Sequence, residues 1–458
     1  MNSDTIAAIA TAMSPSGIGI IRISGADALP VIDRIYRSKQ GHKTLSSCES
    51  HTIHYGYIYD GQELVDEVMV LLMKAPHSYT TEDTVEIDCH GGVYVMKRVL
   101  ETVLKHGARP AEPGEFTKRA FLNGRIDLTQ AESVIDVINA KNAFALKSSL
   151  SQLKGAVYVD IREIRAEILH EIAFIESALD DPEYISLDNY PQVMHKKVDN
   201  LVEKMDNIVK TFENGRFLRE GIKTVIVGKP NAGKSSLLNI LVGEERAIVT
   251  EIAGTTRDVL EEQINLNGIT LNVMDTAGIR DTEDVVEKIG VERARTYAAE
   301  ADLVIYVIDA STALDASDYA IMELLRDKKA IVLLNKSDLD TKVTAEEVRQ
   351  LLDKKIIPIS AKEQQGIEEL EETIRSMFFQ GEVTFNDEVY AINMRQKASL
   401  QNALEHLHQV AQSIDDGMPE DFYSIDLMGA YEALGRIIGE AVEDDLVDEI
   451  FSKFCMGK

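Results

Sequence analysis

The sequence GKPNAGKS, residues 228–235, follows the short apolar run Thr224–Val227 and precedes a segment with helical spacing. It matches the pattern G-x-x-x-x-G-K-[ST] of a phosphate-binding loop, in the strand–loop–helix setting that this loop requires. The glycines allow backbone N–H groups to face phosphates at the start of the helix. We predict that Lys234 reaches the β- and γ-phosphates of a nucleotide and that Ser235 is a ligand of Mg²⁺.

Two short motifs further along the chain predict which base the nucleotide carries. The first, Asn335-Lys336-Ser337-Asp338, ends the apolar run Ala330–Leu334. Its aspartate can accept from N1–H and the N2 amine of guanine, whereas adenine has an acceptor at N1 and no N2 amine. The second motif, Ser360-Ala361-Lys362, follows the next apolar run and completes a guanine-binding wall. In this order and spacing, the motifs predict GTP rather than ATP.

A third motif, Asp275-Thr276-Ala277-Gly278, ends another apolar run. We predict that Asp275 lies behind Mg²⁺ and that the N–H of Gly278 donates to the γ-phosphate. The pair Thr255-Thr256 lies between this motif and the phosphate-binding loop. A switch threonine at this place ligates Mg²⁺ once GTP is bound, and we assign that role to Thr256.

The residue after Gly278 bears on how GTP is hydrolysed. Ras-type GTPases carry a glutamine there to orient water, but this chain has Ile279, which neither donates nor accepts. Hydrolysis therefore requires another device. Asn231 offers a side-chain amide beside the phosphates, suited to a monovalent cation that would supply the positive charge of an arginine finger. Arg257 and Arg280 are the alternative, as fingers within the chain.

The region from Lys223 to about Phe379 alternates short apolar runs with helical patterns, which predicts a doubly wound, mostly parallel sheet. Its runs are Thr224–Val227, Leu271–Met274, Leu303–Ile308, Ala330–Leu334 and Ile356–Ile359. The first 118 residues predict an α+β fold. Its expected strands are Ile18–Ile23, Val68–Met73 and Thr84–Asp88, followed by a helix over Tyr94–His106.

The segments that flank the α/β region are helical. One apolar stripe of helical spacing runs along Ile161, Ile164, Ile168, Ile172, Ile175 and Leu179, and another along Leu400, Leu404, Leu407, Ala411 and Ile414. The final segment is too short to bury its stripe alone, and insertion of one domain into another is well tolerated. We predict an α+β domain at 1–118, an α/β domain at 218–381, and one all-α domain split between 119–217 and 382–458.

The composition and charge of the chain argue against several classes of protein. The chain has 458 residues and a formal net charge of −29, which disfavours an autonomous nucleic-acid binder because phosphate contacts dominate such affinity. Its three cysteines predict neither a disulfide framework nor a structural zinc site. No apolar run is long enough to span a bilayer, and the first residues lack the basic start of a secretory signal. We therefore expect a cytoplasmic protein.

Several motifs together resemble one family, the bacterial tRNA-modification GTPases called MnmE or TrmE. The resemblance covers essentially the whole chain. The motifs are Gly228–Leu238, Ile252–Asp258, Asp275–Gly278, His90–Gly92, Gly114–Phe116, Arg119–Gly124 and the C-terminal Cys455–Lys458. The resemblance implies that the α/β domain is a GTPase domain and that the N-terminal domain forms a constitutive dimer and binds 5-formyl- or methylene-tetrahydrofolate.

The resemblance also implies a mechanism of hydrolysis. K⁺ is bound by Asn231 and by Thr250, Ile252 and Thr255, and two GTPase domains dimerise across GTP. A second-switch glutamate matching Glu287 helps to arrange the catalytic site with Asn231 and Lys234, although the residues alone do not distinguish it from Glu283 or Glu292. The implied GTP contacts are Asn231, Ala232, Gly233, Lys234, Ser235, Ser236, Thr250, Glu251, Ile252, Ala253, Gly254, Thr255, Thr256, Asp275, Thr276, Ala277, Gly278, Asn335, Lys336, Asp338, Ser360, Ala361 and Lys362.

For the folate, the matching positions are Arg22, Glu86, Arg125 and Lys458. A carboxylate can accept from the amide and amine edge of a pterin, and arginines suit the carboxylates of a folate. Cys455 is either a nucleophile near the one-carbon donor or a small residue that lines the pocket. Acidic residues nearby in sequence would raise the pKa of its thiol and oppose the first role.

The function that the resemblance implies is enzymatic. With an FAD-containing partner, MnmG or GidA, a homodimer forms a heterotetramer that installs an aminomethyl or carboxymethylaminomethyl group at C5 of the wobble uridine of certain tRNAs. The partner would hold most of the tRNA. The alternative is a regulatory or ribosome-assembly GTPase of the Era or EngA type, but those append a basic RNA-binding domain and Gly439–Glu449 carries six acids and no base. A membrane scaffold of the dynamin type lacks a basic amphipathic face here.

Overall fold

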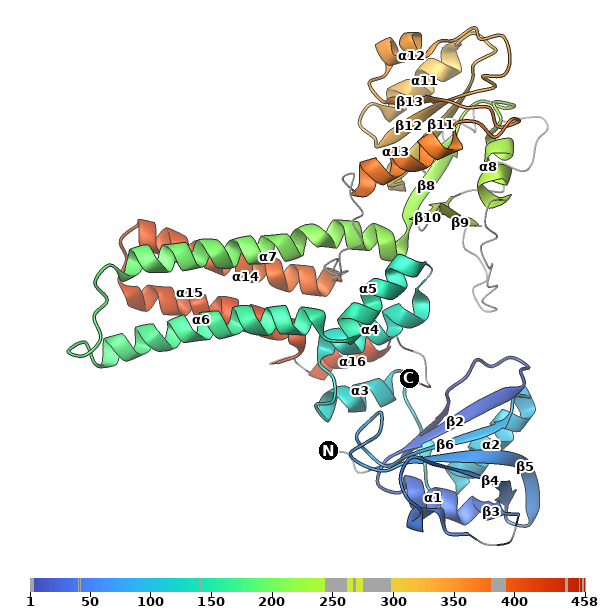
Figure 1. The fold of residues 1–458 in the computed structure, drawn as a ribbon, viewed down its shortest axis with the longest axis vertical. Coiled ribbons are helices and arrows are strands. Elements are labelled where there is room, and N and C mark those ends of the chain that lie inside the picture. Colours follow the sequence, from blue (N-terminus) through green and yellow to red (C-terminus); the bar gives the residue numbers. More distant parts are fainter. Residues whose placement is uncertain are drawn as a thin grey trace. The chain divides into compact units, whose positions relative to one another are not determined.

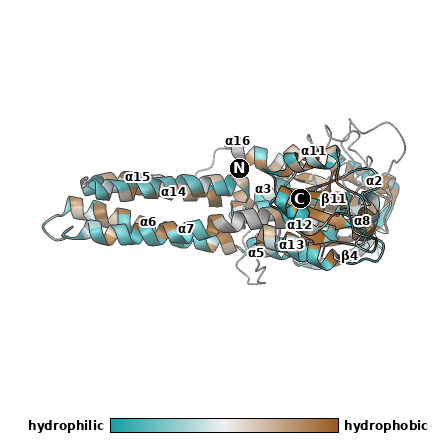
Figure 2. Cartoon of the chain, turned by 90° about the horizontal axis from the view of Figure 1, so that it is seen from above, coloured by the Kyte–Doolittle hydropathy of each residue, from teal (hydrophilic) through white to brown (hydrophobic). Residues whose placement is uncertain are grey.

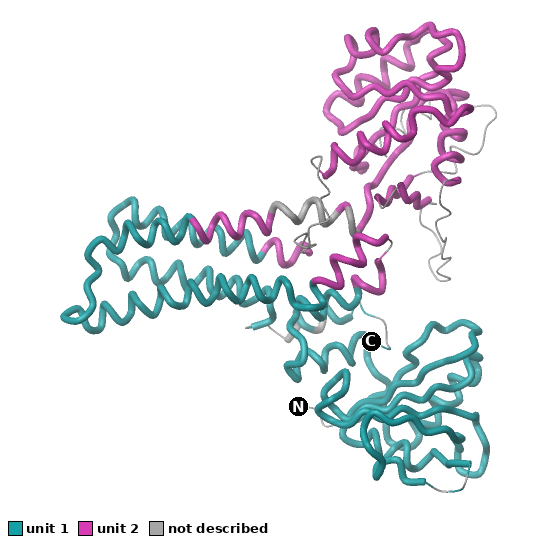
Figure 3. The backbone as a smooth tube through the Cα atoms, viewed as in Figure 1, with its two compact units in different colours: residues 1–135, 152–199, 399–458 teal, residues 136–151, 200–398 magenta. Residues whose placement is uncertain are grey.

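The computed structural model describes residues 4–39, 41, 43–140, 142–243, 262–266, 269–274, 298–379, 393–440, 444–452, 454 and 457. Contacts divide the chain into two compact units, shown in Figure 3. Unit 1 comprises Met1–Ile135, Gln152–Asp199 and Ser399–Lys458, and unit 2 comprises Asp136–Ser151 and Asn200–Ala398. Residues 136–151 and 200–217 thus group with the α/β region, and the predicted limits at 118 and 217 fall inside helices. The predicted domain organisation remains a prediction.

A seven-stranded sheet forms the N-terminal part of unit 1, in the order β3-β4-β5-β6-β2-β1-β7. Its pairs are antiparallel except for β1 with β7. Helices α1 and α2 cover one face through a shared apolar core (Figure 1). The bounds are β1 Ile6–Ile9, β2 Ile18–Ser24, α1 Ala28–Ile35, β3 Tyr36–Ser38, β4 Thr52–Asp60, β5 Glu63–Met73, β6 Thr84–His90, α2 Val93–Lys105 and β7 Arg109–Pro110, with a 3₁₀ turn at Leu45–Ser47. The predicted α+β fold is confirmed for this part.

Helices before and after the α/β region pack together in unit 1, because α6 lies along α15. The predicted stripe of α6 is buried at each of its five isoleucines, but Leu179, one residue before the end of the helix, is 44% exposed. In Figure 2, teal and brown residues alternate along these long helices. The helices that flank the α/β sheet are α3 Glu115–Leu122, α4 Leu128–Asn139, α5 Ala143–Leu153, α6 Ala156–Asp180, α7 Tyr190–Glu220, α14 Met394–Asp415, α15 Glu420–Ile438 and α16 Asp444–Ser452. Of these, α5 belongs largely to unit 2, and α4, α7 and α14 belong partly to it.

None of the helices in the described part of the chain is both long enough and apolar enough to cross a membrane.

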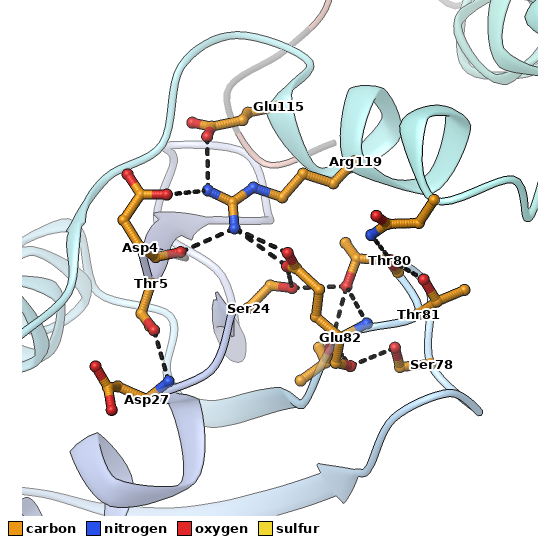
Figure 4. A network of polar contacts seen from close by, with 12 residues as sticks. Asp4, Thr5, Ser24, Asp27, Ser78, Thr80, Thr81, Glu82, Glu115 and Arg119 are labelled. Atoms are coloured by element: carbon orange, nitrogen blue, oxygen red, sulfur yellow. Dashed lines mark hydrogen bonds and ion pairs between the residues drawn. The ribbon is translucent and has the colours of Figure 1, made fainter. Parts of the chain in front are cut away.

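A buried arginine joins the sheet of unit 1 to α3 (Figure 4). The side chain of Arg119 is only 9% exposed, and its guanidinium donates to Glu82, to Glu115 and to both the carbonyl and the carboxylate of Asp4. Arg109 in turn donates to Asp4 and Glu115. The start of β1, the loop before β6 and helix α3 therefore share one network of charges.

This network predicts a loss of stability in acid. Burial would raise the pKa of Asp4 and of Glu115, but the two arginines outweigh it and hold both pKa values below their usual range. A lowered folded-state pKa gives stability that is complete above the unfolded value, about 4, and is lost as the pH falls through the folded value. We expect the free energy of unfolding of unit 1, measured by chemical denaturation, to fall as the pH drops from 5 to 3. A constant value over that window would contradict this.

The core of unit 2 is a six-stranded sheet in the order β13-β12-β11-β8-β10-β9. Every pair is parallel except β10 with β9. Apolar clusters cover both faces, as the continuous apolar runs predicted. The bounds are β8 Ile222–Val227, α8 Lys234–Gly243, β9 Glu262–Leu266, β10 Ile269–Val273, β11 Leu303–Asp309, α11 Ala316–Leu325, β12 Ala330–Asn335, α12 Ala345–Leu351, β13 Lys355–Pro358 and α13 Ile367–Phe379.

Candidate functional site

The phosphate-binding loop connects β8 to α8 at the carboxyl edge of the parallel sheet. Gly228 adopts a φ of +151°, and a Cβ there would lie 2.3 Å from the carbonyl oxygen of Val307. Gly233 adopts a φ of +99°, and a Cβ there would lie 2.0 Å from Nδ2 of Asn335. Both positions therefore require glycine. Asn231, between them, is exposed and has a φ of +61°, the left-handed region that asparagine tolerates better than most residues.

The side chain of Lys234 folds back onto carbonyl groups of its own loop. The Nζ of Lys234 donates to the carbonyl oxygens of Gly228 at 2.8 Å and of Lys229 at 2.7 Å. Burial lowers the pKa of Lys234. Ser235 follows it in the first turn of α8, where helix N–H groups favour an anion. The loop thus brings an ammonium, a hydroxyl and the N–H groups of the first helical turn into one short stretch of chain.

The two guanine motifs meet beside this loop. Nδ2 of Asn335 donates to the carbonyl of Ala232 at 2.8 Å, and its Oδ1 accepts from the backbone N–H of Ala361 at 3.0 Å. The hydroxyl of Ser360 donates to Oδ1 of Asp338 at 2.7 Å. That hydrogen bond is the main reason why the pKa of Asp338 is lowered, so its carboxylate is charged and can accept two hydrogen bonds from a base.

The two lysines of these motifs differ in surroundings. Lys336 has a φ of +65°, and its Nζ donates to Asp309 at 2.6 Å. Lys362 is exposed. The structure thus brings together Asn335, Lys336, Asp338, Ser360, Ala361 and Lys362 at the edge that carries the phosphate-binding loop.

A second group of predicted residues meets in unit 1. Arg22 on β2 and Glu86 on β6 are register partners, and Nε of Arg22 lies 2.7 Å from Oε1 of Glu86. Nη1 of Arg22 also donates to the carbonyl of Gly457 at 3.2 Å. The ring of Tyr79 lies within 5.5 Å of the Arg22 guanidinium and 4.6 Å of that of Arg125. Two guanidiniums, a carboxylate and an aromatic ring therefore lie together.

Sequence reasoning missed three members of this group. Tyr79 and Phe116 both lie against Arg22, and Oδ1 of Asp88 is buried without a hydrogen-bond partner among the described residues. Burial first, and then Glu86, raise the pKa of Asp88. Period-two alternation puts Asp88 on the same face as Glu86 and could have found it, whereas the aromatic residues come from other segments.

Known protein families match nearly the whole chain. The pattern of the GTP-binding protein TrmE N-terminus matches residues 5–125, and that of the MnmE helical domain matches residues 128–455. The tRNA modification GTPase MnmE of Lachnoclostridium phytofermentans is 59% identical over 100% of both chains. The chain belongs to the MnmE family of tRNA-modification GTPases. The resemblance inferred from the motifs is confirmed.

Further MnmE relatives also align with this chain over nearly their whole length. The protein of Alkaliphilus metalliredigens is 48% identical over 99% of both chains, and that of Bacillus subtilis is 46% identical over 99% of this chain and 100% of its own. Among solved structures, the G domain of the T. maritima FeoB iron transporter is 28% identical over 33% of this chain and 96% of that chain, with a TM-score of 0.26. The MnmE helical match begins before the α/β sheet and ends after it.

Other predicted MnmE site residues lie outside the described part of the chain. They are Thr250, Glu251, Ile252, Ala253, Gly254, Thr255, Thr256, Asp275, Thr276, Ala277, Gly278, Glu287, Cys455 and Lys458. Arg257 and Arg280, the alternative fingers, fall there as well. The roles assigned to all these residues, and to those placed above, remain predictions.

Proposed function

We propose that this chain hydrolyses GTP with Mg²⁺ and takes part in modifying the wobble uridine of certain tRNAs in the cytoplasm. One observation carries the GTP assignment most strongly. The loop with Lys234 is tied through Ala232 to Asn335, whose motif also supplies the charged carboxylate of Asp338. A phosphate site and a guanine-accepting carboxylate at one edge of a doubly wound sheet make a nucleotide site. Membership of the MnmE family supplies the tRNA part of the proposal.

We propose that hydrolysis depends on K⁺ held by Asn231 together with Thr250, Ile252 and Thr255, as two GTPase domains dimerise across GTP. The support is the exposed amide of Asn231, raised on a left-handed turn beside the phosphate-binding lysine, and Ile279 at the usual place of a water-orienting glutamine. A bound cation would stabilise charge that develops in the transition state. Glu287 is proposed to arrange the catalytic site.

The test is GTP turnover by the full chain with Mg²⁺ in KCl and in NaCl at equal ionic strength. We expect turnover to rise by on the order of 10²-fold in KCl, the size of one transition-state charge contact. Choline chloride at the same concentration controls for ionic strength. Equal rates in all three salts would refute the cation mechanism and favour an arginine finger in a switch GTPase of the Era or EngA type.

For the one-carbon donor, we propose 5-formyl- or methylene-tetrahydrofolate, bound by Arg22, Glu86, Arg125 and Lys458. The residues described in unit 1 suit such a ligand. A pterin can stack on Tyr79 and donate to the carboxylate of Glu86, and Arg125 can pair with a folate carboxylate. The carbonyl of Gly457 accepts from Arg22, so this residue of the C-terminal tail lies at the site.

We further propose that the chain is a homodimer through its N-terminal sheet and pairs with FAD-containing MnmG (GidA) as a heterotetramer. The face of the sheet opposite α1 and α2 carries large exposed apolar side chains, which favour burial against another surface. They are Ile18, Ile53, Tyr55 and Met69. The net charge of −29 supports a partner that holds most of the tRNA.

A further inference from the structure

Lys229 is the second residue of the phosphate-binding loop, yet its side chain does not face the phosphate side. Its Nζ lies 2.7 Å from Oδ2 of Asp318 and 2.9 Å from Oδ2 of Asp315. Asp315 is the N-cap of α11, and Asp318 completes its capping box. The loop is therefore tied to the first turn of the helix that follows β11.

The acceptor of this ion pair is deeply buried. The side chain of Asp318 is 1% exposed, and its Oδ1 accepts from the hydroxyl of the fully buried Tyr306 at 2.8 Å. Its Oδ2 accepts from the backbone N–H of Asp315 at 3.0 Å. Among the described residues, Lys229 is the cation paired with this carboxylate. An exposed ion pair contributes little, but a buried carboxylate that loses its cation is costly.

The backbone of Lys229 leads from this ion pair to the nucleotide side of the loop. Its carbonyl oxygen accepts from Nζ of Lys234 at 2.7 Å and from the backbone N–H of Ala232 at 3.3 Å. Ala232 is held from the other side by Asn335. The turn that presents Asn231 at positive φ is thus fixed at both ends, by Lys229 and by Ala232.

We propose that Lys229 is a positioning residue that holds the turn of Asn231 in the geometry required for the monovalent cation. Its side chain acts through Asp318 and Tyr306 and touches neither nucleotide nor cation. This inference deepens the proposed K⁺ mechanism and rests on it. Loss of the ion pair frees one end of the turn, so the amide of Asn231 spends less time in the cation-binding position. Residues that orient a metal ligand commonly change metal affinity by about 10–100-fold when they are removed.

The experiment is a KCl titration of GTP turnover at constant ionic strength with the full chain. We expect Lys229→Met to raise the potassium midpoint by about 10-fold or more, with a much smaller change in KM for GTP. Lys229→Arg keeps the charge and should restore the midpoint to near the parent value. Lys355→Met is the matched control, because Lys355 pairs with Glu369 at 3.0 Å on the exposed surface of the same unit. A merely structural role would lower thermal stability without moving the midpoint.

Two further variants keep the test decisive. Tyr306→Phe removes one hydroxyl from Asp318 but retains the ion pair, so it should shift the midpoint in the same direction by less. Tyr306→Phe tests the proposal by itself if Lys229→Met does not fold. Asp318→Asn should match Lys229→Met, and the double variant should be no worse than either, because both remove one interaction.

An unchanged midpoint in folded Lys229→Met, or an equal loss in Lys229→Arg, would overturn the proposal. If the parent chain shows no potassium activation, the proposed cation mechanism fails. The positioning role rests on that mechanism and fails with it, whereas an unchanged midpoint beside a potassium-activated parent overturns the positioning role alone.

Discussion

Replacing Asp338 by asparagine is expected to weaken GDP and GTP binding by on the order of 10³-fold, because a site built to hydrogen-bond a base strongly rejects a mismatched one. The carboxylate accepts both from N1–H and from the N2 amine of guanine. Asparagine keeps one acceptor but turns an N–H donor toward the N2 amine, so two donors meet. Xanthine has an oxygen at that place, so xanthosine nucleotides should bind the variant better than guanosine nucleotides do. Competition against a fluorescent GDP measures both affinities.

The structure indicates that this variant will fold. The hydroxyl of Ser360 donates to Oδ1 of Asp338 and can donate equally to the amide oxygen of asparagine. Asp340→Asn is the matched control, since Asp340 is an exposed carboxylate two residues away. Undiminished GDP binding by Asp338→Asn, or an equal loss in Asp340→Asn, would show that the base is read elsewhere.

Replacing Arg119 by methionine is expected to destabilise unit 1 by about 3–5 kcal/mol, the cost of breaking a buried ion pair from one side. The guanidinium donates to Asp4, Glu82 and Glu115. Methionine leaves Glu82 without its arginine and leaves Arg109 as the cation that pairs with Asp4 and Glu115. Chemical denaturation of the full chain, followed by circular dichroism, should show an earlier transition for unit 1. Unit 2 should keep its own midpoint, because the two units need not unfold together.

Lys105→Met is the control for this second variant. Lys105 pairs with Asp60 in the same unit, but its side chain is 56% exposed. Its removal should leave the transition of unit 1 where it is. If unit 1 of Arg119→Met and of Lys105→Met unfolded at the same denaturant concentration, the network would be shown to contribute no net stability. Arg119→Met should also weaken the acid dependence expected for Asp4 and Glu115.

Much of the α/β unit could be predicted because its five parallel strands each have a local signal, whereas the antiparallel strand β9 was not predicted. The parallel strands are buried on both faces, so they appear as continuous apolar runs, and β8, β11 and β12 match the predicted runs closely. The phosphate-binding loop needs glycine at fixed places, so its pattern is visible in sequence. Leu179 shows the limit of periodicity, since a stripe does not reveal where a helix stops being covered by its neighbour.

The N-terminal group could be predicted only in part. Arg22 and Glu86 were identified through the resemblance to the family, and their pairing across two strands requires the register of the sheet. Tyr79, Asp88 and Phe116 were missed, because what makes them notable is proximity to Arg22 or burial without a partner. Neither property can be read from the sequence, because each depends on segments that are far apart in the chain.

The sequence by itself determined the nucleotide chemistry, because the loop GKPNAGKS and the two guanine motifs encode backbone geometry and donor–acceptor patterns within a few residues. Only the tertiary structure decided which way Lys229 points, which carboxylates surround Arg119, and that the carbonyl of Gly457 meets Arg22. Those contacts include pairs of residues that are 86, 115 and 435 positions apart in the chain. Their energies depend on burial and distance, which arise only when the chain is folded.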